Sequence, residues 1–463
     1  IMKRLLNIIL ILIPIPGNIL AQDAPMEFSM NEAKEYALQH NKTLQNARED
    51  LRIANESYKE SRGSGLPQLS GTVDYMTNFN YEFELELGGG GSTEPPQIDY
   101  SLLDQGDYEV LDFINQSFGS TGPSTIIMKD QASAVFQVSQ LIFSGQYWIG
   151  LELAKIGEIL SEKNISLTEL DVKNQVMNTY QLILGSEELL AIIKENEKNL
   201  TEILKHTRNM YEAGMAEQTD VDQIRINLSQ LENSRRSMER NIQMSYNMLR
   251  FLMGIESNNE LMLTNNLNEL ISEIENEQLF SNNSDIKDNP SYQLMQTQEE
   301  MSETNVKMQK WAFAPTLAGY YSYREKILTT AFDLSPKNAA GFTLNIPIYS
   351  GGTKSAALSK ARIELDKTRR NKEMLEEQLR LEKRQLTFEL TSAYENYRTQ
   401  KENVEVAKRM YNSIHNKYIQ GLVSSLDLTQ ANSNYLQAEN NYMSSIIDLL
   451  QAKIKLDKLY NNL

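Results

Sequence analysis

Apolar residues recur at alternating steps of three and four along much of the chain, which is the spacing of a coiled-coil seam. A helix from about Lys354 to Ile419 would be roughly 100 Å long at ~1.5 Å per residue, which is wrong for a compact enzyme domain. No proline lies between Pro123 and Pro290 or after Pro347, as expected if these stretches hold long helices. The last seam consists of Leu428, Ala431, Tyr435, Ala438, Tyr442, Ser445, Leu449, Ala452 and Leu456.

Two other segments, residues 69–75 and 342–349, alternate apolar with other residues and therefore have the period of a β-strand. Stretches of about ten residues with one apolar face and aromatic side chains at both ends are typical of strands in a membrane barrel. A soluble hairpin with one face on a core is the alternative that these segments leave open. The aromatic residues are Phe79, Tyr81 and Phe83 at one end, and Tyr147, Trp148 and Trp311, the candidate membrane-interface residues, at the other.

The chain contains two tandem copies of one unit. Residues 136–145 match residues 342–351 at an offset of 206, whereas Pro67 matches Pro315 at an offset of 248. The difference places 42 extra residues in the first copy, around the flexible run Gly88–Gly91, so we expect a loop insertion there. The predicted division is a signal peptide over residues 1–21, a first repeat over 22–285 and a second repeat over 286–463, each repeat with a helix, a β-hairpin and tip helices.

Each copy supplies one hairpin, so we predict four strands per chain. A membrane barrel must close with at least about eight strands, because lipid cannot satisfy the backbone groups of an open sheet edge. One chain cannot close a barrel. Two chains would give eight strands, and three would give twelve strands around a wider lumen.

The first 21 residues have the features of a secretory signal. Lys3 and Arg4 precede a short apolar run, Leu5–Ile13, and small residues approach a cleavage point before Gln22. Removing them leaves 43 basic and 62 acidic residues, a net charge of −19. This charge excludes a basic nucleic-acid-binding surface. The chain has no cysteine, so a lipidated N-terminal cysteine is excluded too.

No enzymatic site is evident, and we expect no cofactor and no metal. The three histidines, His40, His206 and His415, have no ligand-like spacing. The sequence has no phosphate-binding G-x-x-x-x-G-K motif, and its carboxylates are scattered along helices as solvated faces.

Taken in order and in duplicate, several motifs resemble the TolC-like outer-membrane efflux protein family over essentially the whole mature chain. They are the opening helix Met30–Ala47, the Asn289-Pro290 start of the second copy, Leu66-Pro67 and Ala314-Pro315 before the strands, the Ser-Gly pairs at 144–145 and 350–351, and a doubled Tyr-x-x-Gly-x5-Asp. The resemblance implies a homotrimer with a twelve-stranded β-barrel in the cell outer membrane and a periplasmic α-helical tunnel of ~100 Å. It also implies a periplasmic adaptor protein and an inner-membrane pump as partners. Arg235, on an otherwise apolar seam, departs from the pattern.

The doubled motif marks two helix–helix turns, related by an offset of 207. We predict that its glycines end helices in a left-handed conformation, that its aspartates are N-caps of the returning helices, and that its tyrosines pack in the seams. The resemblance implies that these turns form the periplasmic entrance and the adaptor-docking surface. The six residues are Tyr211, Gly214 and Asp220 in the first copy and Tyr418, Gly421 and Asp427 in the second.

The leading interpretation is a passive exit duct of a tripartite efflux or type I secretion system, in which a pump supplies the energy. A periplasmic coiled-coil structural or adhesive protein without a pore is the alternative.

Overall fold

The computed structural model describes residues 26–77, 79, 81–85, 101, 104–118, 124–128, 130–257, 259–276, 285–328 and 335–463. The predicted signal peptide, residues 1–21, lies outside the described residues. The chain forms two compact units, each described by itself below. Unit 1 comprises residues 1–55, 156–302 and 364–463, and unit 2 comprises residues 56–155 and 303–363.

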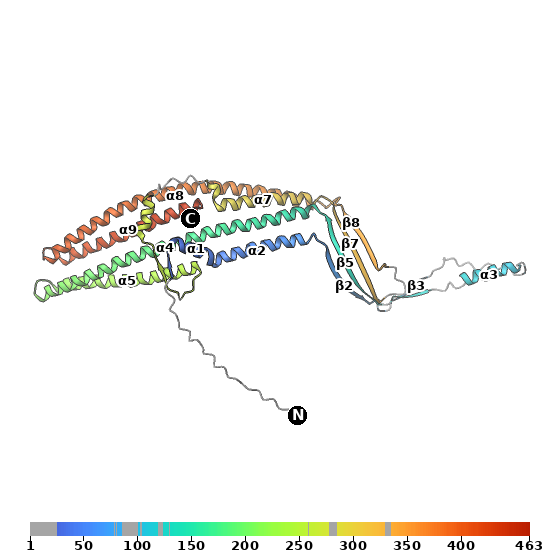
Figure 1. Ribbon diagram of the computed structural model, residues 1–463, viewed down its shortest axis with the longest axis horizontal. Helices are drawn as coiled ribbons and strands as arrows, with labels where there is room; N and C mark the ends of the chain where they lie inside the picture. The colour runs from blue at the N-terminus through green and yellow to red at the C-terminus, as the bar shows by residue number, and fades with distance from the viewer. Residues whose placement is uncertain are drawn as a thin grey trace, which may run out of the picture. The chain divides into compact units, whose positions relative to one another are not determined.

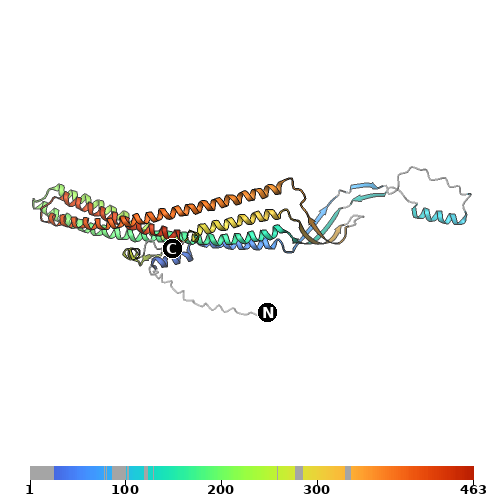
Figure 2. The same ribbon diagram turned by 90° about the horizontal axis from the view of Figure 1, so that it is seen from above.

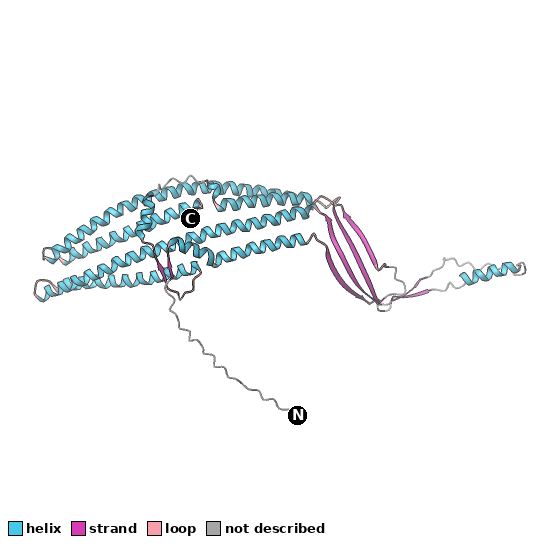
Figure 3. Cartoon of the chain, viewed as in Figure 1, coloured by secondary structure: helices cyan, strands magenta, loops and turns pink. Residues whose placement is uncertain are grey.

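Unit 1 is built mainly from long helices (Figures 1 and 3). α4 (Gly145–Glu212) and α5 (Gln218–Met253) form one antiparallel pair, and α8 (Thr353–Ile419) and α9 (Ser425–Leu459) form the other. The helix predicted from about Lys354 to Ile419 is confirmed to within one residue. In unit 1 these helices lie side by side in the order α8, α9, α4, α5, and the turned view shows that they form a thin layer (Figures 1 and 2).

The predicted seams are the buried stripes of these helices. On α8 the stripe includes Leu386, Leu390 and Tyr397, and on α9 it includes Leu428 and Leu449, each at most 7% exposed. Each such side chain contributes about 1.5–3 kcal/mol when it is fully buried. Packing of these stripes, rather than helix propensity alone, therefore stabilises the long helices.

Arg235 fits into its seam because carboxylates surround it. Its guanidinium lies 2.8 Å from Glu197 of α4 and 2.9 Å from Glu239 of α5. The side chain stays 24% exposed, so the charge keeps contact with water. The departure from the apolar pattern is thus compensated locally.

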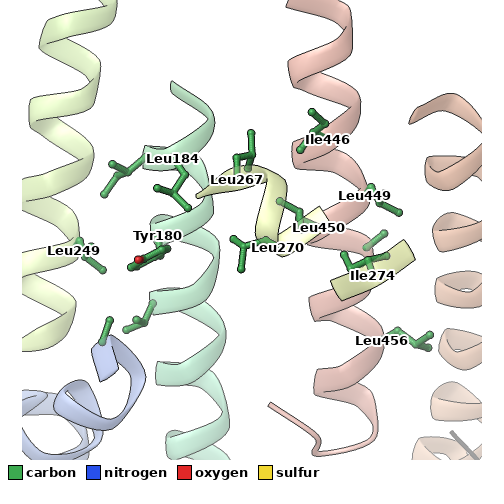
Figure 4. Packing of buried hydrophobic residues seen from close by; sticks show 14 of the residues in the cluster. Tyr180, Leu184, Leu249, Leu267, Leu270, Ile274, Ile446, Leu449, Leu450 and Leu456 are labelled. Carbon is green, nitrogen blue, oxygen red and sulfur yellow. The ribbon is translucent and has the colours of Figure 1, made fainter. Parts of the chain in front are cut away.

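A small α/β layer crosses the middle of unit 1. β1 (Met26–Phe28) pairs in parallel with β6 (Leu261–Leu263), and α6 (Leu267–Asn276) follows. The buried Tyr180 hydroxyl donates to the Phe28 carbonyl oxygen at 2.9 Å. Figure 4 shows how α6 packs on the neighbouring helices, with Leu267, Leu270 and Ile274 beside Leu184, Leu450 and Leu449.

The opening helix is interrupted, contrary to the prediction of one helix over Met30–Ala47. α1 (Met30–His40) ends before Asn41, whose backbone is extended, and α2 (Lys42–Gly63) begins after it. The Asn41 amide donates to the Leu252 carbonyl oxygen at 2.7 Å, and its Oδ1 accepts from the Leu44 N–H at 3.1 Å. Asn41 therefore caps α2 and joins it to the end of α5, a long-range contact that a local pattern does not reveal.

Unit 2 contains an antiparallel four-stranded sheet in the order β2-β5-β7-β8. The strands are β2 (Gln68–Met76), β5 (Gln131–Phe143), β7 (Thr316–Leu328) and β8 (Asn338–Asn345). In each predicted hairpin the two strands pair with each other, β2 with β5 and β7 with β8. β5 also pairs with β7, which joins the two hairpins. β2 and β8 are the outer strands of this sheet, so each leaves one edge without a described partner.

Two expectations about the strands need correction. The alternating segment 342–349 does not form a strand throughout, because β8 ends at Asn345, ahead of Pro347, which has no N–H for a sheet ladder. The insertion is also not only a loop. β3 (Tyr81–Leu85) pairs with β4 (Ser124–Met128), and α3 (Gln105–Phe118) lies between them in sequence. The run Gly88–Gly91 lies outside the described residues.

The remaining elements are η2 (Ile286–Asp288) and α7 (Pro290–Trp311), which opens the second repeat. Asn289 is buried before α7 and donates to the Leu459 carbonyl oxygen at 2.9 Å. Within the described ranges, every helix lacks the long uncharged apolar stretch that a bilayer crossing needs.

Candidate functional site

The two turns at the tip of unit 1 share one backbone design. Gly214 and Gly421 have φ of 74° and 73°, a left-handed conformation that glycine adopts without strain. The N–H of each glycine donates to the carbonyl oxygen of the tyrosine three residues earlier, Tyr211 or Tyr418, at 2.9 Å. The predicted left-handed helix ends are therefore present in both copies.

The aspartates stand one turn further into the returning helices than predicted. The N-caps are Glu217 and Ser424, and Asp220 and Asp427 are the third residues of α5 and α9. Their carboxylates accept from the N-cap N–H groups at 3.0 Å, which is the reciprocal bond of a capping box. The prediction that Asp220 and Asp427 are themselves the N-caps was wrong, because each lies three positions after the N-cap. An acidic residue three positions after a possible N-cap is the sequence signal of a capping box.

Hydrogen bonds also set the charge at this turn. The Ser424 hydroxyl donates to Asp427 at 2.7 Å and its backbone N–H donates as well. Both bonds stabilise the carboxylate and lower the pKa of Asp427. Asp427 is therefore ionised at neutral pH.

Polar contacts join the two helical pairs near the tip. Asp220 of α5 accepts a hydrogen bond from Ser425 of α9, and Asn227 donates to Thr429 at 3.0 Å. The Tyr418 hydroxyl lies 2.5 Å from that of Thr207 on α4. Sequence reasoning missed Thr207, Ser425 and the Asn227–Thr429 pair, because no spacing rule links residues about 200 positions apart.

The two equivalent tyrosines have different environments. Tyr418 is buried between α4 and α9, as the seam pattern predicts, and burial raises the pKa of its phenol. Tyr211 is 43% exposed, so a single chain does not pack it fully. The predicted packing role of Tyr211 is wrong within one chain, since no second helical pair follows on that side.

The three candidate interface aromatics lie near the helical ends of the strands in unit 2. Trp311 covers Gly145 so closely that a Cβ there would meet its ring at 2.1 Å, and Tyr147 covers Gly65 in the same way. The Tyr147 hydroxyl also donates to the Arg62 carbonyl oxygen at 3.0 Å. Trp148 is 60% exposed and packs edge-on against Tyr147.

The described residues contain no cluster of histidine, aspartate and glutamate that could hold a metal ion. His206 lies edge-on to Tyr418, and His40 stacks on Tyr36, so both have aromatic neighbours.

A comparison with protein-family models decides the family. The model described as outer membrane efflux protein matches residues 115–255 and 284–462, more than half of the chain. The chain belongs to the outer membrane efflux protein family. This outer membrane efflux protein is thus a passive conduit of the outer membrane with a periplasmic helical tunnel, and it is not an enzyme.

Several solved structures have a similar fold. The outer membrane protein VceC of Vibrio cholerae has a TM-score of 0.68 at 15% identity, covering 93% of this chain and 96% of that one. The CmeC outer membrane channel of Campylobacter jejuni has a TM-score of 0.68 at 17% identity, covering 94% and 85%. CusC has a TM-score of 0.72 at 15% identity, covering 96% and 95%. Among curated proteins, none matches the sequence.

Proposed function

We propose that three copies of this efflux protein form one exit duct, with a twelve-stranded barrel in the outer membrane and a helical tunnel in the periplasm. The observation that carries the proposal is the four-stranded sheet with two outer strands. β2 and β8 run antiparallel to each other in this sheet, so β8 of one copy can pair with β2 of the next without changing the antiparallel order.

Pairing between copies satisfies the edge groups that lipid would leave without partners. Two copies would also close a ring, with eight strands. Three are favoured because eight strands enclose an interior that side chains fill, whereas a duct needs a wider lumen.

In this arrangement the tip turns lie at the periplasmic mouth, and the insertion between β2 and β5, which contains β3, α3 and β4, lies at the cell-surface end. The tip turns, with Gly214, Gly421 and their neighbours, would receive a periplasmic adaptor, and an inner-membrane pump would supply the energy. The coiled-coil alternative without a pore has no specific support, since family membership favours a channel.

Electrical recording tests the duct. Purified protein added to a planar lipid bilayer should produce discrete steps of ionic conductance at low protein concentration. A protein that folds and binds lipid but never conducts at any applied membrane voltage would contradict the proposed duct.

A further inference from the structure

The two faces of the sheet β2-β5-β7-β8 differ in character. Successive residues of a strand point to opposite faces, so the pairing register assigns each residue to one face. One face is apolar and carries Leu69, Val73, Phe136, Val138, Tyr321, Tyr323, Phe342 and Leu344, each at least 36% exposed. The opposite face carries Gln68, Ser70, Thr72, Gln137, Ser139, Ser322, Thr343 and Asn345. In a membrane barrel the apolar face meets lipid and the polar face lines the lumen, so the second face is the lumen face of the proposed duct.

Arg324 of β7 brings a permanent positive charge to the lumen face. It stands opposite Val135 of β5, and Val135 stands opposite Thr72 of β2. On its other side its N–H donates to the Lys337 carbonyl oxygen at 2.7 Å. Arg324 is eight residues beyond Thr316, the first residue of β7, which corresponds to about 26 Å at ~3.3 Å per residue. In the proposed orientation it therefore lies toward the cell-surface end of the barrel.

A hydrogen bond holds the Arg324 guanidinium in place. Its Nη1 donates to the Ser133 hydroxyl oxygen at 3.1 Å, from β7 to the neighbouring β5. This bond uses only part of the N–H donors of a guanidinium, and the side chain is exposed. The planar fork of arginine matches the oxygens of a carboxylate or phosphate group. Arg324 is thus both held in position and accessible to an oxyanion in the lumen.

The lumen face has more basic than acidic groups. The charged residues that the described strands place on it are Asp74, Arg324 and Lys326, which gives one net positive charge per chain. On the apolar face the charges are balanced, because the Lys337 ammonium donates to the Glu325 carboxylate at 3.3 Å. The whole chain has a net charge of −17, so the positive lumen face is a local departure from its composition. Rings of arginine or lysine side chains favour anions in pores.

We infer that the Arg324 side chains of three copies form a ring in the barrel that binds the carboxylate or phosphate group of anionic solutes on their way out. This inference rests on the trimeric duct proposed above and names a class of solute that the duct favours. Ser133 is a positioning residue, because its hydroxyl holds the guanidinium. Binding at the ring must stay weak, since a conduit has to release the solute to the exterior.

Ion selectivity tests the ring. Single channels are recorded in a planar bilayer under a KCl gradient around ~0.15 M, where charges more than about 8 Å away are largely screened. Arg324→Gln should shift the reversal potential toward the value for potassium, because the wall loses its excess of positive charge. Arg324→Lys keeps the charge and should keep the potential. Lys337→Gln removes the same charge from the apolar face and is the matched control. An unchanged potential in Arg324→Gln would overturn the inference.

Block by pyrophosphate tests oxyanion binding. Pyrophosphate added on the barrel side should reduce the single-channel current of the unsubstituted protein, with a half-effective concentration that rises severalfold in Arg324→Gln. Ser133→Ala keeps the charge but releases the guanidinium, so it should weaken the block while the reversal potential stays the same. If pyrophosphate blocks all three proteins equally, or none of them, the inferred site is wrong.

Conductance and native size separate the levels of failure. If the unsubstituted protein never conducts, the proposed duct fails, and the ring fails with it. If it conducts, and the variants keep its trimeric mass, its selectivity and its block, only the ring is wrong. If Arg324→Gln alone does not assemble, Arg324→Lys and Ser133→Ala decide. Both should weaken the block, because one lacks the arginine fork and the other no longer holds it, and an undiminished block in both would overturn the site.

Discussion

At the scale of single residues, Tyr418 and Thr207 show how a hydroxyl pair fixes the tip. The Thr207 hydroxyl donates to the Ile203 carbonyl oxygen at 2.8 Å, so its single proton is already used. Tyr418 is therefore the donor in the 2.5 Å contact between the two hydroxyls. This bond connects α8 to α4, the two helices that lead into the two turns.

Tyr418→Phe should loosen this connection without leaving a cavity. Loss of one hydrogen bond costs about 1 kcal/mol, or roughly a fivefold change in a local opening equilibrium. Hydrogen–deuterium exchange of the amides around residues 203–211 should become faster by about that factor. Tyr211→Phe is the matched control, because it removes the same atom at the half-exposed equivalent position. Equal acceleration in both variants would show that the Thr207 bond does not hold the tip.

Asp220 and Asp427 provide a second test at this scale. In three copies they would place up to six carboxylates near the mouth, which attracts cations. Replacing both with Asn keeps an acceptor for the N-cap N–H and removes the charge. The double variant should show lower cation selectivity in single-channel recordings at low salt, when screening is weak.

Asp50→Asn is the control for this charge effect, because it removes the same charge from the exposed surface of α2. If the Asp220→Asn, Asp427→Asn double variant keeps the cation selectivity of the unsubstituted protein, these aspartates only cap their helices.

At the scale of elements, Asn41 joins three segments that are far apart in sequence. It ends α1, caps α2 and bonds to the Leu252 carbonyl oxygen near the end of α5, while only 5% exposed. Asn41→Ala leaves that carbonyl oxygen and the Leu44 N–H without this partner. Losing a cap and a buried hydrogen bond should lower the free energy of unfolding by about 1–3 kcal/mol.

Thermal unfolding followed by circular dichroism measures this effect. The midpoint should fall for Asn41→Ala and stay close to its original value for Asn46→Ala, a matched change on the exposed face of α2. A midpoint for Asn41→Ala that equals that of Asn46→Ala would contradict the role of Asn41 as a junction.

Elements with a strong hydrophobic periodicity could be predicted from the sequence, whereas elements whose ends are fixed by distant contacts could not. α8 was predicted to within one residue because its seam repeats over many turns. The break at Asn41 depends on a residue 211 positions away, and the α3 and β3–β4 elements lie in an insertion without a clear period. At the tip, the left-handed conformation of the two glycines could be predicted, because it is a local backbone preference. The hydrogen-bond partners of Asp220 and Tyr418 could not be predicted, because they lie on the other helical pair.

At the scale of the whole molecule, both the sheet and the helical layer end in surfaces that one chain leaves open. β2 and β8 each leave one edge without a described partner, and Phe251 of α5 and Phe388 of α8 are each 73% exposed. In the proposed trimer, contacts between copies would cover such surfaces. The half-exposed Tyr211 fits the proposed trimer, because its equivalent, Tyr418, is buried and contacts Thr207 of α4 within one chain.

Native mass spectrometry of the protein extracted from membranes in detergent tests the central claim most directly. The account predicts a complex with three times the mass of the mature chain, and this complex should survive dilution because each copy contributes both edges of the ring. A well-folded monomer with its full strand content, or a closed dimer, would contradict the trimeric duct.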